Sequence, residues 1–168
     1  VYRATGEEKY REKFESLISS DRAYSSCNRP ISWDEKYPGV YILSAQILKD
    51  DKYLKQAYKY CDQILDCDKT PAGFASSKGF PDRAQIGMLK AAATVAFFAN
   101  NLPENDEKRP SYIKFVQSKI NYILGDNPLG INYVVGAEEN SPKSVHHRAA
   151  SYTTETNGLP SKNVYTLW

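Results

Sequence analysis

The sequence predicts an all-α fold whose antiparallel helices lie in an inner and an outer layer, as in an α/α toroid or part of one. Two observations favour this fold. Apolar residues recur at helical spacing in five segments of the 168-residue chain. Segments that are apolar on one face alternate with segments that are apolar almost all round, in the order outer, inner, outer, inner, outer. Helical spacing alone also fits an irregular helical bundle, which is the alternative fold.

Three segments are amphipathic and are the expected outer helices. The first follows a capping box at residues 5–8, in which a Thr hydroxyl and a Glu carboxylate bond each other's backbone amides. The next runs over about residues 51–65. The last begins at Pro110, a residue favoured at the first helical position, and ends at Gly125, a residue favoured just after a helix.

Two segments are apolar around most of their circumference and are the expected inner helices. One covers residues 40–48 and follows a second capping box at residues 32–35. The other is the Ala-rich segment at about residues 82–100. We expect both helices to be buried on most sides, because helices without a polar face lie inside a protein.

Composition limits the classes of partner. The chain is 41% hydrophobic and 25% charged, as globular domains are, and no stretch is apolar for long enough to span a membrane. A net charge of +2 provides no basic field, so we expect no nucleic-acid partner. Cys27, Cys61 and Cys67 lack the spacing of a metal site, and either one disulfide or three free thiols fit them. We expect no cofactor and no metal.

Residues 126–168 lose the helical pattern, apart from a β-prone stretch at 131–135, and long segments of this kind are often functional. Both histidines of the chain lie there, in the run His146-His147-Arg148. In an extended segment His146 and Arg148 project to one side and His147 to the other, which suits a polyol or an anion. A surface turn with incidental histidines is the alternative, and a metal site lacks a third ligand.

Other catalytic chemistries find little support in the sequence. No Ser or Cys lies in the context of an activated nucleophile. No spacing selects a catalytic pair among the carboxylates, and the run 126–128 (Asp-Asn-Pro) is first a turn signature. The carboxylates considered are Asp34, Glu35, Asp126, Glu138, Glu139 and Glu155.

Four collinear stretches closely resemble glycoside hydrolase family 9, the cellulases and endo-β-1,4-glucanases. Residues 122–151, which contain Tyr-Val-Val-Gly and His-His-Arg at matching spacing, are similar to the histidine signature of that family. Residues 2–10, residues 32–36 (Ser-Trp-Asp-Glu-Lys) and residues 70–73 (Thr-Pro-Ala-Gly) are similar to it in the same order. The resemblance covers essentially the whole chain.

The resemblance implies a fold, an activity and a division of the chain. The fold is part of an (α/α)6 barrel, helical over residues 1–125 and substrate-contacting over residues 126–168. The activity is inverting hydrolysis of internal β-1,4-glucosidic bonds in cellulose or related glucans by a secreted or vacuolar enzyme. Its partners are the glucan and the remaining segments of the barrel. A non-catalytic glucan-binding or structural protein on the same barrel is the alternative.

The resemblance also implies roles for individual residues. His146 is the expected catalytic contact near the cleaved bond, with Arg148 and His147 as substrate-binding neighbours. Trp33 is the expected stacking platform for a sugar, or alternatively a core anchor. The family's Asp-Ala-Gly-Asp base motif and the Glu beyond Gly-Ala-Leu-Val-Gly-Gly-Pro are both missing from this sequence. We therefore expect this chain alone to be inactive, because inversion needs two carboxyls.

Four residues depart from the family pattern. Asn132 stands where the family usually has Ser, and Glu138 stands where it has the second Gly of Gly-x-Gly. Ile86 and Ala91 stand at the two aromatic positions of a Trp-Gly-Ser-Leu-Arg-Tyr run.

Overall fold

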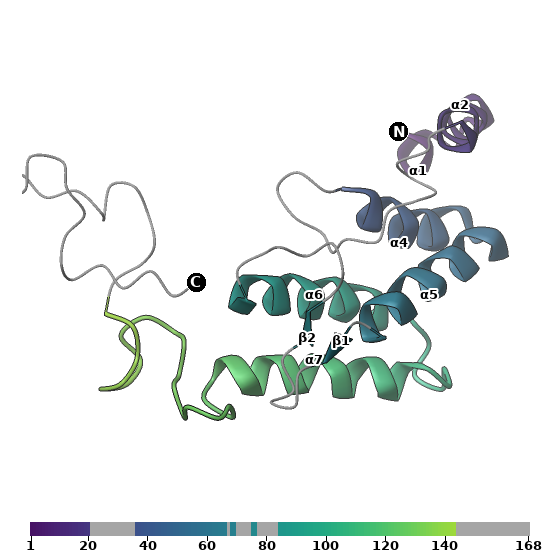
Figure 1. Cartoon of the computed structure of the whole chain (residues 1–168). Helices are drawn as coiled ribbons and strands as arrows, with labels where there is room; N and C mark the ends of the chain where they lie inside the picture. The colour runs from purple at the N-terminus through teal and green to yellow at the C-terminus, as the bar shows by residue number, and fades with distance from the viewer. Residues whose placement is uncertain (21–35, 67, 70–74, 77–83, 144–168) are drawn as a thin grey trace, which may run out of the picture.

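The computed structural model describes residues 1–20, 36–66, 68–69, 75–76 and 84–143. The regular elements of the described part are helices, as predicted, apart from one pair of two-residue strands (Figure 1). The strands pair antiparallel, with Asp68 opposite Ser76 and Lys69 opposite Ala75. The elements are α1 (Tyr2–Thr5), α2 (Glu8–Ser19), α4 (Tyr37–Leu48), α5 (Asp51–Leu65), β1 (Asp68–Lys69), β2 (Ala75–Ser76), α6 (Ala84–Ala99) and α7 (Arg109–Ile123).

Two helical hairpins form the body of the structure. α4 packs on α5 through a connection of only two residues, in which Lys49 takes a left-handed conformation (φ 50°) and Asp50 caps α5 by accepting from Lys52 N at 3.0 Å. α6 packs along α7, as Figure 1 shows, and smaller contacts join α6 to α4 and α5. Consecutive helices therefore lie side by side, as in a slice of a two-layer barrel.

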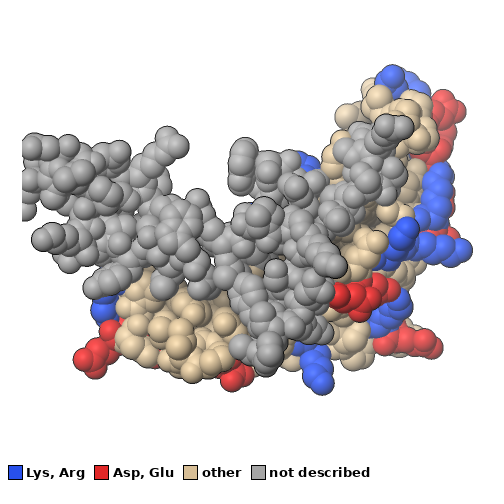
Figure 2. All heavy atoms as spheres, viewed as in Figure 1, with Lys and Arg blue, Asp and Glu red and all other residues tan. Residues whose placement is uncertain are grey.

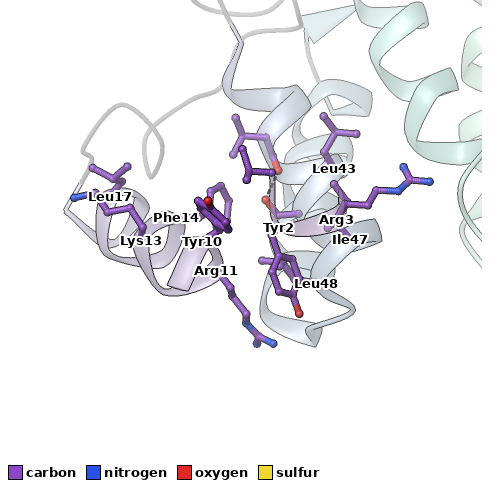
Figure 3. Close-up of a pocket in the computed structure, with 13 residues that line it drawn as sticks. Tyr2, Arg3, Tyr10, Arg11, Lys13, Phe14, Leu17, Leu43, Ile47 and Leu48 are labelled. Carbon is purple, nitrogen blue, oxygen red and sulfur yellow. Dashed lines mark hydrogen bonds between the residues drawn. The ribbon is translucent and has the colours of Figure 1, made fainter. Parts of the chain in front are cut away.

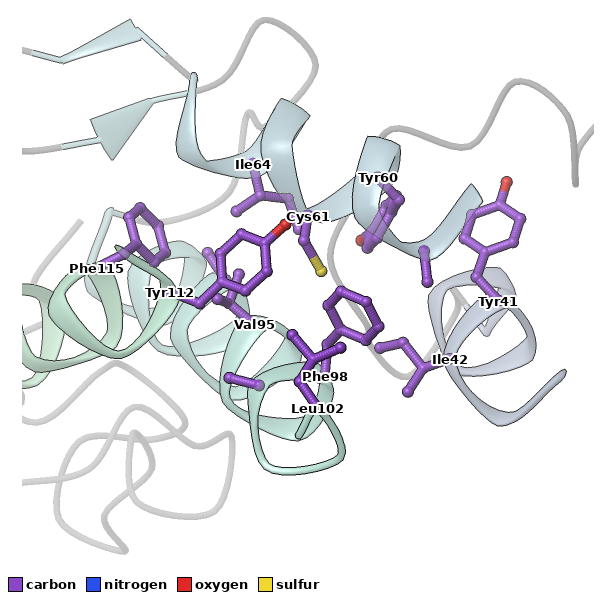
Figure 4. Packing of buried hydrophobic residues seen from close by; sticks show 13 residues of the cluster. Tyr41, Ile42, Tyr60, Cys61, Ile64, Val95, Phe98, Leu102, Tyr112 and Phe115 are labelled. Atoms are coloured by element: carbon purple, nitrogen blue, oxygen red, sulfur yellow. The ribbon is translucent and has the colours of Figure 1, made fainter. Parts of the chain in front are cut away.

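The core lies where the two hairpins meet (Figure 4). Large rings fill it: Tyr41 and Tyr60 pack with their centroids 5.4 Å apart, and Phe98 and Tyr112 with theirs 5.8 Å apart. Each of the four main helices contributes to this cluster, so α4–α7 stabilise one another. The cluster comprises Tyr41, Ile42, Ala57, Tyr60, Cys61, Ile64, Ala91, Val95, Phe98, Ala99, Leu102, Tyr112 and Phe115.

The predicted outer helices agree with α2, α5 and α7, except at the start of α2. α7 ends at Ile123, and Gly125 follows with φ 119°, a conformation that favours glycine. The capping box expected at residues 5–8 is wrong. Thr5 is the last residue of α1, Gly6 ends that helix with φ 71°, and the Thr5 hydroxyl accepts from Glu7 N at 3.2 Å. The second capping box, at residues 32–35, lies outside the described residues.

The expected inner helices, α4 and α6, are buried on one side only. Tyr41 and Ile42 are fully buried, but Leu43 on the same helix is 43% exposed. On α6, Leu89 is 50% and Phe97 is 39% exposed. The prediction of burial on most sides was wrong for the described part of the chain: Leu43 lines a cavity that separates α4 from α1 and α2, and Leu89 and Phe97 of α6 are exposed.

The β-prone stretch at residues 131–135 forms no strand, which corrects that expectation. One of its backbone groups bonds to the end of α7 instead: Tyr133 N donates to Ile123 O at 2.8 Å. The β-prone residues favoured a strand, but residues 124–143 have no partner strand among the described residues.

The charged side chains are unevenly distributed over the face in Figure 2. Lys, Arg, Asp and Glu gather along the edge formed by α2 and α5, whereas the end of α7 and the following loop show mostly uncharged atoms. Of the helices described, none combines the length and hydropathy that crossing a bilayer requires.

Candidate functional site

The predicted site residues His146, His147, Arg148 and Trp33 all lie outside the described residues. The structure does describe the segment that leads to the first three, residues 124–143, which we name the α7 loop. It contains no helix or strand, so its shape depends on hydrogen bonds made by side chains.

Asn127 holds the first half of the α7 loop. Its Nδ2 donates to Tyr122 O at 2.7 Å and to Ile131 O at 2.8 Å, so both amide hydrogens are used. Its Oδ1 accepts from Leu129 N at 3.2 Å and from Ile131 N at 3.3 Å. The turn expected at residues 126–128 is therefore present, and one side chain bonds it to the end of α7.

Asn132 and Glu138 hold the second half. Asn132 is only 9% exposed; its Oδ1 accepts from Val134 N at 3.0 Å, and its Nδ2 donates to Glu138 Oε1 at 3.1 Å. The Glu138 backbone N donates to Ser141 Oγ at 3.1 Å, and Gly136 N donates to Pro142 O at 2.9 Å. These contacts close the loop on itself directly before the His-His-Arg run.

The α7 loop also presents rings and apolar side chains. The rings of Tyr122 and Tyr133 stack with their centroids 6.4 Å apart and their planes 15° apart. Burial raises the pKa of Tyr122, and the neighbouring Tyr133 raises it further. Stacked rings beside amide groups suit a ligand with apolar faces and hydroxyl edges. Four apolar side chains are exposed here: Leu124, Leu129, Val134 and Val135.

A polar cluster that the sequence analysis did not predict joins α5 to α7. Tyr112 donates to Asp62 at 2.7 Å, Lys108 pairs with Asp62, and Tyr58 donates to Asp106. Burial is the main cause that raises the pKa of Tyr112, and its hydrogen bond to Asp62 raises it further. Burial likewise raises the pKa of Tyr58, and its hydrogen bond to Asp106 adds to the effect. Both phenols stay protonated donors, so the cluster acts as a structural clamp. The sequence signal that could have predicted the cluster is the placement of both tyrosines on the apolar stripes of their helices, α5 and α7.

The carboxylate of Asp106 completes this clamp. The hydrogen bond from Tyr58 lowers its pKa, and so do the backbone N–H groups of Lys108 and Arg109, at 2.9 and 3.1 Å. Asp106 thus holds the start of α7 against α5.

A cavity of about 430 Å³ lies between α1, α2 and α4 (Figure 3). Tyr10 and Phe14 line it from α2, and Leu43 and Ile47 line it from α4. Its walls are mostly apolar, with no carboxylate among them, which is unsuited to acid–base catalysis.

Potential metal ligands are scattered in the described part of the chain, where no three His, Cys, Asp or Glu side chains come together. Cys61 is a buried free thiol whose pKa is raised by burial and then by Asp62. Cys27 and Cys67 lie outside the described residues.

Comparison with known sequences identifies endoglucanases among the relatives of this chain. The sequence model of glycosyl hydrolase family 9 matches residues 1–168. Endoglucanase A of Bacillus pumilus is 31% identical over 96% of this chain and 26% of its own length. Endoglucanase 22 of Oryza sativa subsp. japonica is 29% identical over 90% of this chain and 33% of its own length. The chain thus spans between a quarter and a third of these relatives.

Comparison with solved structures gives the same result. The cellulase Cel9M of C. cellulolyticum, in complex with cellobiose, has a TM-score of 0.75 at 22% identity, over 96% of this chain and 38% of that one. The endoglucanase CelQ from Clostridium thermocellum, complexed with cellotetraose, has a TM-score of 0.72 at 28% identity, and the match covers 89% of this chain and 26% of CelQ. These cellulases are (α/α)6 barrels, so the predicted fold class is confirmed and the irregular bundle was wrong.

Proposed function

Because the chain belongs to glycosyl hydrolase family 9, as the sequence predicted, we propose that the protein containing it hydrolyses internal β-1,4-glucosidic bonds of cellulose or related glucans. The family match over all 168 residues carries this proposal. Endoglucanases among the relatives and cello-oligosaccharides in the similar structures support it.

In this proposal the chain supplies the sugar-binding side of the cleft. His146 contacts the glucan near the cleaved bond, Arg148 binds it beside that position, His147 is the neighbour of both, and Trp33 stacks on a sugar ring. These contacts orient the glucosyl ring and strengthen as it distorts towards the transition state. The stacked Tyr122 and Tyr133 at the start of the α7 loop support a sugar-binding role for this segment.

The acid and base belong to other segments of the same protein. An inverting enzyme places two carboxyls about 6.5–9.5 Å apart with a water molecule between them. The carboxylates of the α7 loop, Asp126, Glu138 and Glu139, are exposed, and Glu138 already accepts from Asn132. We therefore assign residues 1–168 to part of a catalytic domain, with residues 126–168 as its substrate-contacting segment.

The remaining segments of the barrel are the proposed partner of the uncovered helix faces. Leu89, Ala93 and Phe97 repeat every four residues along α6 and are exposed, and Leu43 is exposed on α4. Such a stripe on an otherwise buried helix needs an apolar neighbour, which a closed barrel supplies. We propose secretion or delivery to a vacuole as the localisation of the protein, and cellulose, as an extracellular polymer, supports secretion.

A non-catalytic glucan-binding protein is the second candidate, favoured by the departures at Ile86, Ala91, Asn132 and Glu138. The full-length protein, incubated with carboxymethylcellulose, decides between the two. We expect a rapid fall in viscosity, new reducing ends, and an α-anomer as first product by NMR. A folded protein that binds cellotetraose without releasing reducing ends would establish the binding protein instead.

A further inference from the structure

A further cavity, of about 350 Å³, lies where the α4–α5 connection meets the α6–α7 connection, and we name it the hairpin cavity. Its walls come from both helical hairpins. The α6–α7 connection leads into the start of α7, whereas the α7 loop follows the other end of that helix (Figure 1). Since α7 has 15 residues, the two ends lie about 22 Å apart. The volume of the hairpin cavity is in the range of sites for small ligands.

Apolar side chains form one wall of the hairpin cavity. Tyr58 of α5 and Phe98 of α6 meet edge to face, with their ring centroids 5.1 Å apart. Leu54 and Leu102 continue this wall from the same two hairpins. The position of the Tyr58 ring is fixed, because its hydroxyl donates to Asp106. The cavity therefore presents a preformed apolar surface to a ligand.

The charged groups of the hairpin cavity compensate one another. Asp106 already accepts from the Tyr58 hydroxyl and from two backbone N–H groups. Asp50 accepts from a backbone N–H group of α5 at 3.0 Å. The ammonium of Lys49 and the carboxylate of Asp51 also line the cavity, and both residues are exposed. Because these last two charges are opposite, the cavity favours a neutral ligand.

Two amides supply the unused hydrogen-bonding groups of the hairpin cavity. The Gln46 side chain is half-buried and makes no hydrogen bond within the described part of the chain. Asn101 donates from Nδ2 to Phe97 O at 2.6 Å, which leaves its Oδ1 as an acceptor. Gln46 belongs to α4 and Asn101 follows α6, so the two amides lie on different walls. Hydroxyl groups of a ligand can bond both, and they restore hydrogen bonds that a half-buried amide lacks.

We propose that the hairpin cavity binds one pyranose ring of a neutral sugar, with an apolar face of the ring against Tyr58 and its hydroxyls at Gln46 and Asn101. A pyranose carries apolar C–H faces and hydroxyl groups at its edge, which match an apolar wall between two amides. The choice of a glucose-based sugar rests on the proposed function, because a β-1,4-glucan is assigned there. The contact between Tyr58 and Asp106 shapes the cavity before the sugar arrives, which lowers the entropy cost of binding.

Hydrogen exchange of the full-length protein, with and without cellobiose, tests the hairpin cavity by position. We expect cellobiose to slow the exchange of peptides covering residues 42–54 and 98–106, and the effect to saturate. Gln46→Leu removes the unbonded amide and Ala45→Leu fills the cavity, so each should weaken cellobiose binding at these peptides roughly fivefold or more. Gln56→Leu on α5 is the matched control, since Gln56 is also half-buried but lies outside the cavity.

Unprotected cavity peptides in the wild type would overturn the proposal, and so would wild-type cellobiose affinity in both Q46L and A45L. Equal protection by sorbitol, an open-chain polyol, would overturn the assignment to a pyranose ring. Melting curves identify the folded variants, and either of the two decides the test if the other unfolds. The proposed function fails separately, when the wild-type protein releases no reducing ends from carboxymethylcellulose. The exchange measurement needs no catalysis, so it still decides whether the cavity binds the sugar.

Discussion

Tyr112 donates its hydroxyl hydrogen to Asp62 at 2.7 Å, which joins α7 to α5 across 50 residues of sequence. Tyr112 is fully buried, and its pKa is raised by burial and by Asp62, so the phenol remains a donor. Lys108 pairs with the same carboxylate from the start of α7. This contact therefore sets the position of one hairpin relative to the other.

Replacing Tyr112 with Phe should lower the free energy of unfolding by about 1.5–3 kcal/mol, because a hydrogen bond to a charged group is lost. Denaturant unfolding of the full-length protein measures the change. Tyr10→Phe on α2 is the control, because the Tyr10 hydroxyl has no hydrogen-bond partner in the described part of the chain. Equal losses in both variants would contradict a specific role for Tyr112.

Asp106 should make the stability sensitive to acid. Its ordinary pKa is 3.8, and the Tyr58 hydroxyl and two backbone N–H groups lower it in the folded protein. The stabilisation is therefore present above pH 3.8 and is lost as the pH falls through the lower, folded pKa. We expect the difference in Tm between wild type and Asp106→Asn to shrink below about pH 4.

Glu107→Gln is the control for this pH series, since it removes the same charge from an exposed neighbour. Its Tm should follow that of the wild type at every pH. A constant difference between wild type and Asp106→Asn down to pH 2 would show that the carboxylate is not the titrating group.

The helices were predictable because their signals are local. Pro110, Gly125 and the apolar stripes of α5 and α7 act within a few residues, and the structure has those helices where expected. The start of α2 was not predictable in this way, because Thr5 fits both as the cap of α2 and as the last residue of a preceding helix. The left-handed Gly6 ends that preceding helix and so decides for the second. Burial of α4 and α6 depends on neighbours that composition does not reveal.

His146→Ala or Arg148→Ala in the full-length enzyme should raise the barrier to hydrolysis by about 2–4 kcal/mol, because each removes a contact made in the transition state. His147→Ala should cost much less, since alternation in an extended segment turns it away. Comparison of kcat/KM on a soluble glucan measures all three. Equal losses would contradict the extended conformation on which this prediction depends.

The isolated 168-residue chain should self-associate or lack a cooperative transition. Leaving roughly 400 Å² of apolar surface uncovered costs about 10 kcal/mol, as much as a whole domain's stability. Size-exclusion chromatography and thermal melting of the chain measure this, and Phe97→Gln should reduce the association by removing an exposed ring from α6. A compact wild-type monomer that melts sharply would mean that the slice is a self-sufficient domain.

The interior of the α7 loop was the least predictable part of the site. The turn at Asn127 was expected from its residue types, but the partners of Asn132 lie six residues away and on the backbone of Val134. The β-prone residue types at 131–135 favoured a strand there. Side-chain hydrogen bonds between non-adjacent turns have no sequence period, so no pattern could predict them.

Cys61 gives the molecule an internal reporter of its own opening. Its thiol is fully buried between the hairpins and its pKa is raised by burial. In the folded protein an alkylating reagent therefore cannot reach the sulfur, and the sulfur is not in its reactive thiolate form. The rate at which iodoacetamide modifies this one residue, read by peptide mass, therefore measures how often α5 separates from α6 and α7. Mutations that weaken the Tyr112–Asp62 contact would increase the rate of Cys61 modification, which is measured without any added label.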